Sequence, residues 1–152
     1  FWLCDITFDN KSMSIMTKFY VLLLALLSTV SSVYPQQEND IKNILEACLN
    51  IDELQEYYHP ELQNRVPIII QDDELVPEVK GIIMFEKEVE FWLLEDLFFQ
   101  GVNAYIEILN FEYDQDKASV KFLYPVEGIM IEATLSKVQD QWRIQESKIS
   151  EQ

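Results

Sequence analysis

The clearest evidence for the fold is the segment AYIEILNFEYDQDKASVKFLYPVEGIMIEATLSKVQDQWRIQESKI, residues 104–149. It contains four stretches rich in β-branched and aromatic residues, the composition typical of strands, and short polar turns separate them. The predicted strands are 104–113, 118–124, 128–135 and 141–149. Consecutive strands joined by short turns form an antiparallel meander, so we expect an antiparallel sheet with one face in water.

Alternation along these strands predicts which face of the sheet is buried. In the third strand the apolar set is Ile129, Ile131, Ala133 and Leu135, and it alternates with Met130, Glu132 and Thr134. In the first strand Tyr105, Leu109, Phe111 and Tyr113 share one side, which Glu107 interrupts. We expect the more continuous apolar side to pack on helices that precede the sheet.

Two helices are predicted upstream of the sheet. Apolar residues recur at helical spacing in the first, at Ile41, Ile44, Leu45, Cys48 and Leu49. This helix follows a linker at 33–39, with Asn39 or Asp40 as its cap, and a shorter helix runs from Asp52 to Tyr58. Helices followed by an antiparallel sheet make an α+β fold, with a single domain at 40–152.

Weaker signals lie between the helices and the meander. The apolar run 66–70 is a strand candidate weakened by Pro67, which has no N–H for a ladder. Residues 89–93 alternate as a strand does, and 94–100 is expected to form a helical turn or two that Gly101 closes.

The segment from Met16 to Ser32 has the layout of a secretory signal peptide, with Lys18 before an apolar run and small residues after it. We assign 13–32 to this signal and expect cleavage after Ser32, which makes the mature chain secreted or periplasmic. Residues 1–12 are interpreted as upstream sequence, because Met13 and Met16 are both plausible starts. The run is shorter than the roughly 20 residues that span a bilayer, so no stable membrane anchor is expected after cleavage; a buried core helix is the remaining alternative.

The net charge of −16 limits the partners. The first 32 residues hold two lysines and two aspartates, so cleavage leaves this charge unchanged. Such a charge repels phosphate backbones and anionic lipids, so we expect no nucleic-acid partner and no binding to membrane surfaces. Only Cys48 follows the signal segment, so the mature chain forms no internal disulfide and Cys48 is expected to be a small core residue.

The element order, together with a last hairpin of the form Lys137-x-x-Asp140-x-Trp142-x-Ile144, resembles the nuclear-transport-factor-2-like or cystatin-like α+β architecture. The chain also resembles small exported bacterial proteins of no assigned activity. The resemblance covers roughly 41–149 and implies N-terminal helices packed on a curved antiparallel sheet of four or more strands, forming a conical pocket. Some family members are isomerases, dehydratases or cyclases and others are binding or assembly modules. Gln141 stands where members often have glycine, and no catalytic residue carries over.

A pocket of this kind would give chemical roles to residues within the strands. Glu107, Glu132 and Glu146 are candidate general acids or bases, because burial on a concave face would raise the pKa of a carboxyl group. The candidate ligand-binding residues are Tyr105, Tyr113, Tyr124 and Trp142. The alternative is that the glutamates face water and the aromatic residues belong to the core.

His59 is the only histidine and is a further candidate general base or metal ligand, with a capping or surface role as the alternative. The acidic turns 72–74 and 114–116 lack the twelve-residue calcium loop, so we interpret them as solvated turns and expect no metal site. Three glycines and the absence of phosphate-loop and dinucleotide motifs predict no cofactor.

Two hypotheses about function remain. The first is an exported, non-catalytic module that binds an unknown protein or a small apolar ligand, with a homodimer through an exposed sheet face as one form. The alternative is a pocket enzyme of the isomerase or dehydratase type, in which a desolvated strand glutamate acts as general base. A protease inhibitor is a third reading prompted by the element order, although the Gln-x-Val-x-Gly loop of cystatins is absent.

The signal-peptide prediction is tested by expressing the full chain in a bacterial host and sequencing the N-terminus of the exported product. We expect the sequence Val-Tyr-Pro-Gln, starting at Val33. The Leu24→Arg variant, which interrupts the apolar run, should remain uncleaved in the cell. An uncleaved wild-type chain would contradict the assignment.

Overall fold

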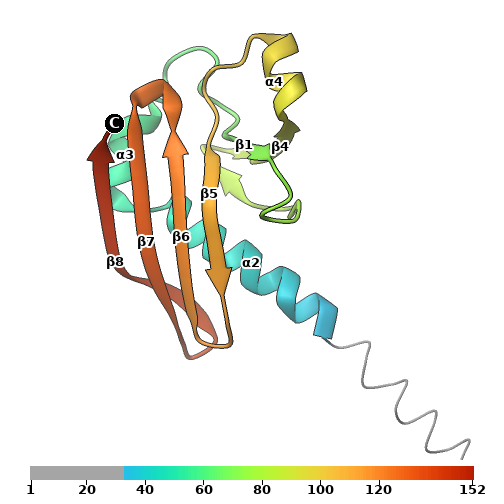
Figure 1. Ribbon diagram of the computed structural model, residues 1–152, viewed down its shortest axis with the longest axis vertical. Coiled ribbons are helices and arrows are strands. Elements are labelled where there is room, and N and C mark those ends of the chain that lie inside the picture. The colour runs from blue at the N-terminus through green and yellow to red at the C-terminus, as the bar shows by residue number, and fades with distance from the viewer. Residues whose placement is uncertain (1–32) are drawn as a thin grey trace, which may run out of the picture. The chain divides into compact units, whose positions relative to one another are not determined.

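The predicted meander is confirmed in the computed structural model, which describes residues 33–152. Its four strands are β5 (Glu107–Tyr113), β6 (Lys117–Tyr124), β7 (Ile129–Val138) and β8 (Gln141–Glu151). They pair antiparallel in chain order, and Figure 1 shows them side by side with α2 and α3 behind. The predicted upstream segment 1–12 and signal peptide 13–32 lie outside the described residues.

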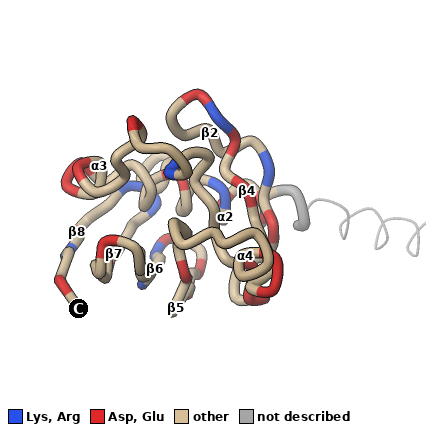
Figure 2. The backbone as a smooth tube through the Cα atoms, turned by 90° about the horizontal axis from the view of Figure 1, so that it is seen from above, with Lys and Arg blue, Asp and Glu red and all other residues tan. Residues whose placement is uncertain are grey.

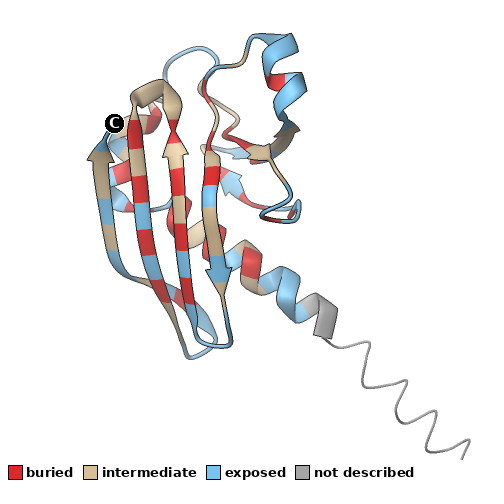
Figure 3. Ribbon diagram, in the orientation of Figure 1, coloured by how far each residue is buried: buried red, intermediate tan, exposed pale blue. Residues whose placement is uncertain are grey.

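One face of this sheet is buried, as the alternation predicts. The buried residues of β6 and β7 are Ala118, Val120, Phe122, Tyr124, Ile129, Ile131, Ala133 and Leu135. The residues between them form the opposite face, which Figure 3 shows as exposed or half-buried bands along the strands. We call these the inner face and the outer face.

A β-bulge in β5 overturns part of the face assignment. The pairing with β6 shifts between Ile108 and Asn110, so Leu109 is the extra residue. Ile108 is buried on the inner face, whereas Leu109 is 41 % exposed. The prediction that Leu109 shares a side with Phe111 was therefore wrong. The same shift explains why Glu107 interrupts the predicted apolar side. Odd-numbered residues before the bulge face the opposite way from odd-numbered residues after it, so Glu107 and Phe111 lie on opposite faces.

Two helices cover the inner face. The first, α2, spans Val33–Leu49, and the second, α3, spans Asp52–Tyr58 as predicted. The apolar stripe of α2 is buried at Ile41, Ile44, Leu45, Cys48 and Leu49. The helix begins at Val33, so the residues assigned to a linker at 33–39 are helical and neither Asn39 nor Asp40 is its cap.

The segment between the helices and the meander forms two smaller strand pairs. Strand β1 (Ile69–Asp72) runs parallel to β4 (Glu90–Leu93), and β2 (Ile83–Met84) pairs with β3 (Lys87–Glu88) as a hairpin. Strand β1 begins at Ile69, beyond Pro67, and not at residue 66 as predicted. A bridge between Ile70 and Ile106 places β1 beside the chain that enters β5.

The predicted helix at 94–100 is confirmed as α4, Leu94–Gln100. Gly101 ends it in the left-handed conformation at φ 68°, and its N–H donates to the carbonyls of Leu97 and Phe98. A 3₁₀ turn, η1 (Pro125–Glu127), joins β6 to β7.

The core is one cluster to which α2, α3, the β2–β3 region and the inner face all contribute. Viewed from above, α2 lies between the four-stranded sheet and the part of the chain that carries β2 (Figure 2). Buried residues from that part include Val76, Val79, Ile82 and Met84. The core thus lies on two sides of α2. Within residues 33–152, no helix combines the length and apolar character needed to cross a membrane.

The central place of α2 is tested by shortening one side chain that it buries. Ile44 is fully buried, so Ile44→Ala should lower the free energy of unfolding by about 2–5 kcal/mol, measured by urea denaturation. Asn43→Ala, at an exposed position of the same helix, should change it by no more than about 0.5 kcal/mol. Equal effects of the two substitutions would contradict this packing.

Candidate functional site

The three candidate glutamates lie on the outer face of the sheet, away from the helices. Glu107 is paired in register with Leu123, Glu132 with Lys121 and Lys148, and Glu146 with Thr134. Glu107 is half-buried, and Glu132 and Glu146 are exposed. None of the three points toward the inner face, where the pocket was expected.

The environment of Glu132 is the opposite of a desolvated pocket. Its Oε1 lies 2.8 Å from the Nζ of Lys121 across the β6–β7 pair. The hydrogen bond and the charge of Lys121 lower the pKa of Glu132 below its ordinary value, with a smaller contribution from Lys148. A general base working near neutral pH needs a raised pKa. Glu132 is therefore a member of a surface ion pair.

Trp142, expected to line a ligand pocket, instead joins the sheet to α2. It is buried on the inner face, and its Nε1 donates to Oδ1 of Asp40 at 2.9 Å. The same carboxylate oxygen lies 2.7 Å from Nζ of Lys137, which also approaches the Trp142 ring, 5.6 Å from its centroid. Asp40, interpreted as a helix cap, thus ties α2 to the β7–β8 hairpin.

Tyr124, like Trp142, joins the sheet to other parts of the fold. It is buried, packs edge-to-face against Tyr58 with ring centroids 5.8 Å apart, and accepts a hydrogen bond from Arg65 at 3.2 Å. Burial raises the pKa of the Tyr124 phenol, and the hydrogen bond from Arg65 opposes this rise. Arg65 also forms an ion pair with Glu127 at 2.6 Å. The phenol is occupied by neighbours from its own chain.

The other two candidate tyrosines do not complete a pocket. Tyr113 is half-buried at the end of β5 and packs against Phe111, with ring centroids 5.8 Å apart. Tyr105 is half-buried just before β5. The predicted site residues therefore lie on two sides of the sheet. The glutamates are on the outer face, and Tyr113, Tyr124 and Trp142 are on the inner face.

His59 lies at the end of α3. It is the C-terminal cap in the left-handed conformation, and its Nδ1 lies 3.3 Å from Glu61 at an exposed position. The acidic turn at 114–116 is closed from within, because Asp114 accepts hydrogen bonds from the N–H groups of Asp116 and Lys117. Those bonds lower the pKa of Asp114. Among the described residues no group of three or more potential metal ligands comes together.

The inner face is packed with apolar side chains. No polar or charged residue is buried within the part of the chain that the structure describes. Burial raises the pKa of the Cys48 thiol to about 12, so this residue is an inert part of the core.

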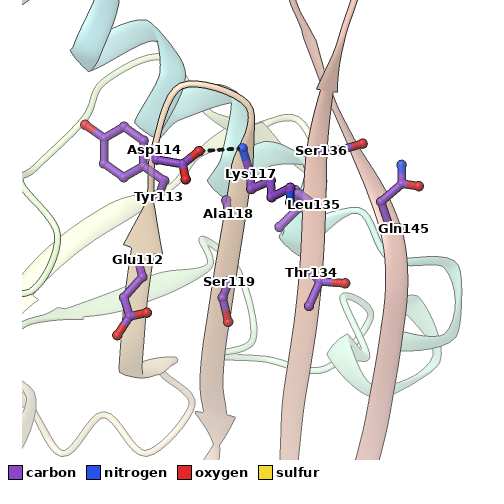
Figure 4. Close-up of a pocket in the computed structure, with 10 residues that line it drawn as sticks. All are labelled: Glu112, Tyr113, Asp114, Lys117, Ala118, Ser119, Thr134, Leu135, Ser136 and Gln145. Carbon is purple, nitrogen blue, oxygen red and sulfur yellow. Dashed lines mark hydrogen bonds between the residues drawn. The ribbon is translucent and has the colours of Figure 1, made fainter.

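A hollow of about 550 Å³ forms a depression on the surface near the β5–β6 turn. Figure 4 shows its lining from four neighbouring strands, including Glu112, Ser119, Thr134 and Gln145, with the Asp114–Lys117 bond at its end. Its carboxylates at Glu112 and Asp114 are exposed. This depression is open to solvent and is not an enclosed site.

A feature missed in the sequence is the exposed apolar surface of α4 and the end of β4. Phe98 is 77 % exposed and Phe99 88 %, and Leu93 and Leu94 are 55 % and 42 % exposed. Figure 3 shows α4 exposed over most of its surface, and Leu97 alone of its residues is buried. We call Leu93, Leu94, Phe98 and Phe99 the α4 patch. The signal was available in the sequence, since Phe98 and Phe99 are adjacent on a short helix and cannot both face one core.

Acidic residues surround the α4 patch. Glu95 and Asp96 lie in the first turn of α4, and Glu90 begins β4. Figure 2 shows red segments at α4 and β4. From residue 88 to residue 116 the chain has eight acidic and no basic residues. The apolar surface therefore lies in a strongly negative field.

A groove borders β4 beside this patch. It has a volume of about 370 Å³ and lies between residues 78–80 and 88–92. Its lining includes Glu78, Glu90, Phe91 and Trp92, and the Trp92 Nε1 donates to Glu90 at 2.8 Å. An aromatic and acidic groove thus continues the α4 patch along the strand.

The position of Glu132 is tested by its NMR titration. Its pKa should lie below the ordinary glutamate value and should rise toward that value in Lys121→Met, while Lys117→Met on the same strand has little effect. Because the folded-state pKa is the lower one, the ion pair stabilises the protein at neutral pH, and this contribution is lost as the pH falls through that pKa. A pKa of Glu132 above the ordinary value would restore the catalytic hypothesis.

Comparisons with known proteins give no family. No protein-family model, no curated protein and no solved structure matches the chain. The resemblance to the nuclear-transport-factor-2-like or cystatin-like architecture stays a prediction, and function is inferred from the geometry of the chain's own residues.

Proposed function

We propose that this chain is an exported, non-catalytic interaction module that binds a basic partner protein through the α4 patch. The observation that carries the proposal is the exposure of Phe98 and Phe99, at 77 % and 88 %, on one short helix. Contiguous exposed apolar surface marks interaction sites, and aromatic residues supply much of the binding energy at protein interfaces. The signal-peptide pattern of 13–32 supports the export.

The charge around the patch supports a basic partner. Glu90, Glu95 and Asp96 flank its apolar residues, and the whole chain has a net charge of −16. A partner surface that carries lysine or arginine around an apolar centre would be attracted over a distance and would meet few like charges. A second copy of this chain would bring carboxylates against carboxylates, so the field opposes a homodimer at this surface.

The described geometry does not favour the alternative of a pocket enzyme. That mechanism needs a strand glutamate with a raised pKa beside tyrosines on a concave face. Among residues 33–152 the candidate glutamates lie on the outer face, the pKa of Glu132 is lowered, and the inner face is packed with apolar side chains. Binding of a small apolar ligand meets the same difficulty, because the described interior is filled.

The proposal is tested by selecting binders of the full chain from a random peptide library and measuring their affinities. We expect the selected peptides to combine lysine or arginine with apolar residues. The Phe98→Ser/Phe99→Ser variant should bind them about tenfold or more weakly, because two exposed aromatic anchors are lost.

Leu109→Ser is the matched control, because Leu109 is an exposed apolar residue of the β5 bulge, outside the α4 patch. It should bind the peptides as the wild type does. Selection of acidic peptides, or equal binding by the wild type and the double variant, would overturn the proposal.

A further inference from the structure

We propose that the partner docks as an extended basic segment that adds a strand to the outer edge of β4, within the groove between residues 78–80 and 88–92. This inference rests on the proposed function and specifies the form and the chemistry of the partner. It depends on three observations: an edge of β4 that no described strand covers, a groove along that edge, and the charge of the groove walls.

The first observation is the pairing of β4. Within residues 33–152 this strand pairs only with β1. The N–H of Glu90 donates to the carbonyl of Ile68 at 3.0 Å, on the β1 side. Backbone groups alternate in direction along a strand, so the N–H and C=O of Phe91 point to the opposite edge. An edge of this kind is a template for strand addition.

The second observation is the groove along that edge. Its volume of about 370 Å³ falls within the ~300–1,000 Å³ range of ligand clefts. One wall is the segment Glu78, Val79 and Lys80, and the other is the end of β3 with β4. Phe91 and Trp92 are half-buried there, so each ring leaves part of its surface in contact with solvent. An extended chain in the groove would bury those ring surfaces.

The third observation is the charge of the groove walls. Three carboxylates, those of Glu78, Glu88 and Glu90, line the groove against the single amine of Lys80. Two of them are held in place by the chain itself. Glu88 accepts a hydrogen bond from the N–H of Gly81 at 2.6 Å, and Glu90 accepts one from Trp92 at 2.8 Å. Fixed negative groups along a strand edge select an occupant that carries positive side chains.

These features together define the occupant. Backbone pairing with β4 would supply affinity that does not depend on sequence, and lysine or arginine on one side of the added strand would face the carboxylates. Apolar residues on the alternate side would contact Phe91, whereas Trp92 lies with Glu90 on the side that meets the basic residues. The occupant is therefore a segment with alternating basic and apolar residues, and the neighbouring α4 patch would contact the rest of the partner.

The test uses the full chain labelled with ¹⁵N and a synthetic acetylated peptide that repeats Lys-Val four times. We expect saturable binding with a Kd at or below about 1 mM, and amide shifts concentrated at residues 78–80 and 88–93. A peptide of the same sequence that is N-methylated on every backbone amide keeps its charge and apolar side chains but has no N–H group to pair with β4 through either edge. It should bind at least about tenfold more weakly.

A charge variant separates strand addition at this groove from general attraction to an acidic protein. Glu78→Lys, at an exposed position of the groove wall, should weaken binding of the Lys-Val peptide about tenfold at low salt. Glu112→Lys makes the same charge change at an exposed position of the outer face and should have a much smaller effect.

Three outcomes would overturn the inference: no binding of the Lys-Val peptide, equal binding of the N-methylated peptide, or amide shifts away from β4. Each is distinct from failure of the proposed function. If the library-selected peptides still require Phe98 and Phe99, the α4 patch remains the docking surface and only strand addition is rejected.

Discussion

The burial of α2 against the inner face of the sheet is the constraint on which the rest of this structure depends. Its stripe of Ile41, Ile44, Leu45 and Cys48 is buried in the same cluster as the apolar residues of β6 and β7. No disulfide stabilises the described chain, where Cys48 is free and buried, so apolar packing is what holds the fold. A helix in this position occupies the space where a sheet of this type could hold a ligand, and this directs the search for function to the exterior.

Polar contacts fix how the helices lie on the sheet. Asp40, on α2, contacts Lys137 and Trp142 at the β7–β8 hairpin. On the opposite side of the fold Arg65 contacts Tyr124 and Glu127. Tyr124 and Trp142, which the sequence analysis predicted to bind a ligand, thus orient the secondary structure. A buried phenol or indole needs a hydrogen-bond partner, and here other parts of the chain supply it.

Local patterns in the sequence predicted the helices and strands well. They could not predict the β-bulges, which depend on how the strands pair. Strand composition located β5 to β8, and Gly101 marked the end of α4. The bulges at Leu109 and Gln145 depend on the register between strands, which no single strand encodes. A bulge changes the face of every residue beyond it, so Glu107 could not be placed relative to Phe111 by alternation alone. The face of a residue then decides whether it is a candidate for catalysis.

We infer that the interior of the described chain is filled and propose that binding takes place on its exterior. This inference is tested most directly by methyl NMR spectra of the full chain recorded under increasing xenon pressure, because xenon enters apolar cavities that are empty. In a filled interior the methyl groups of Ile44, Leu54 and Ile131, all of which are fully buried, should show small, linear and uniform shifts. Large shifts of these groups that saturate with pressure would reveal an internal cavity and contradict the account.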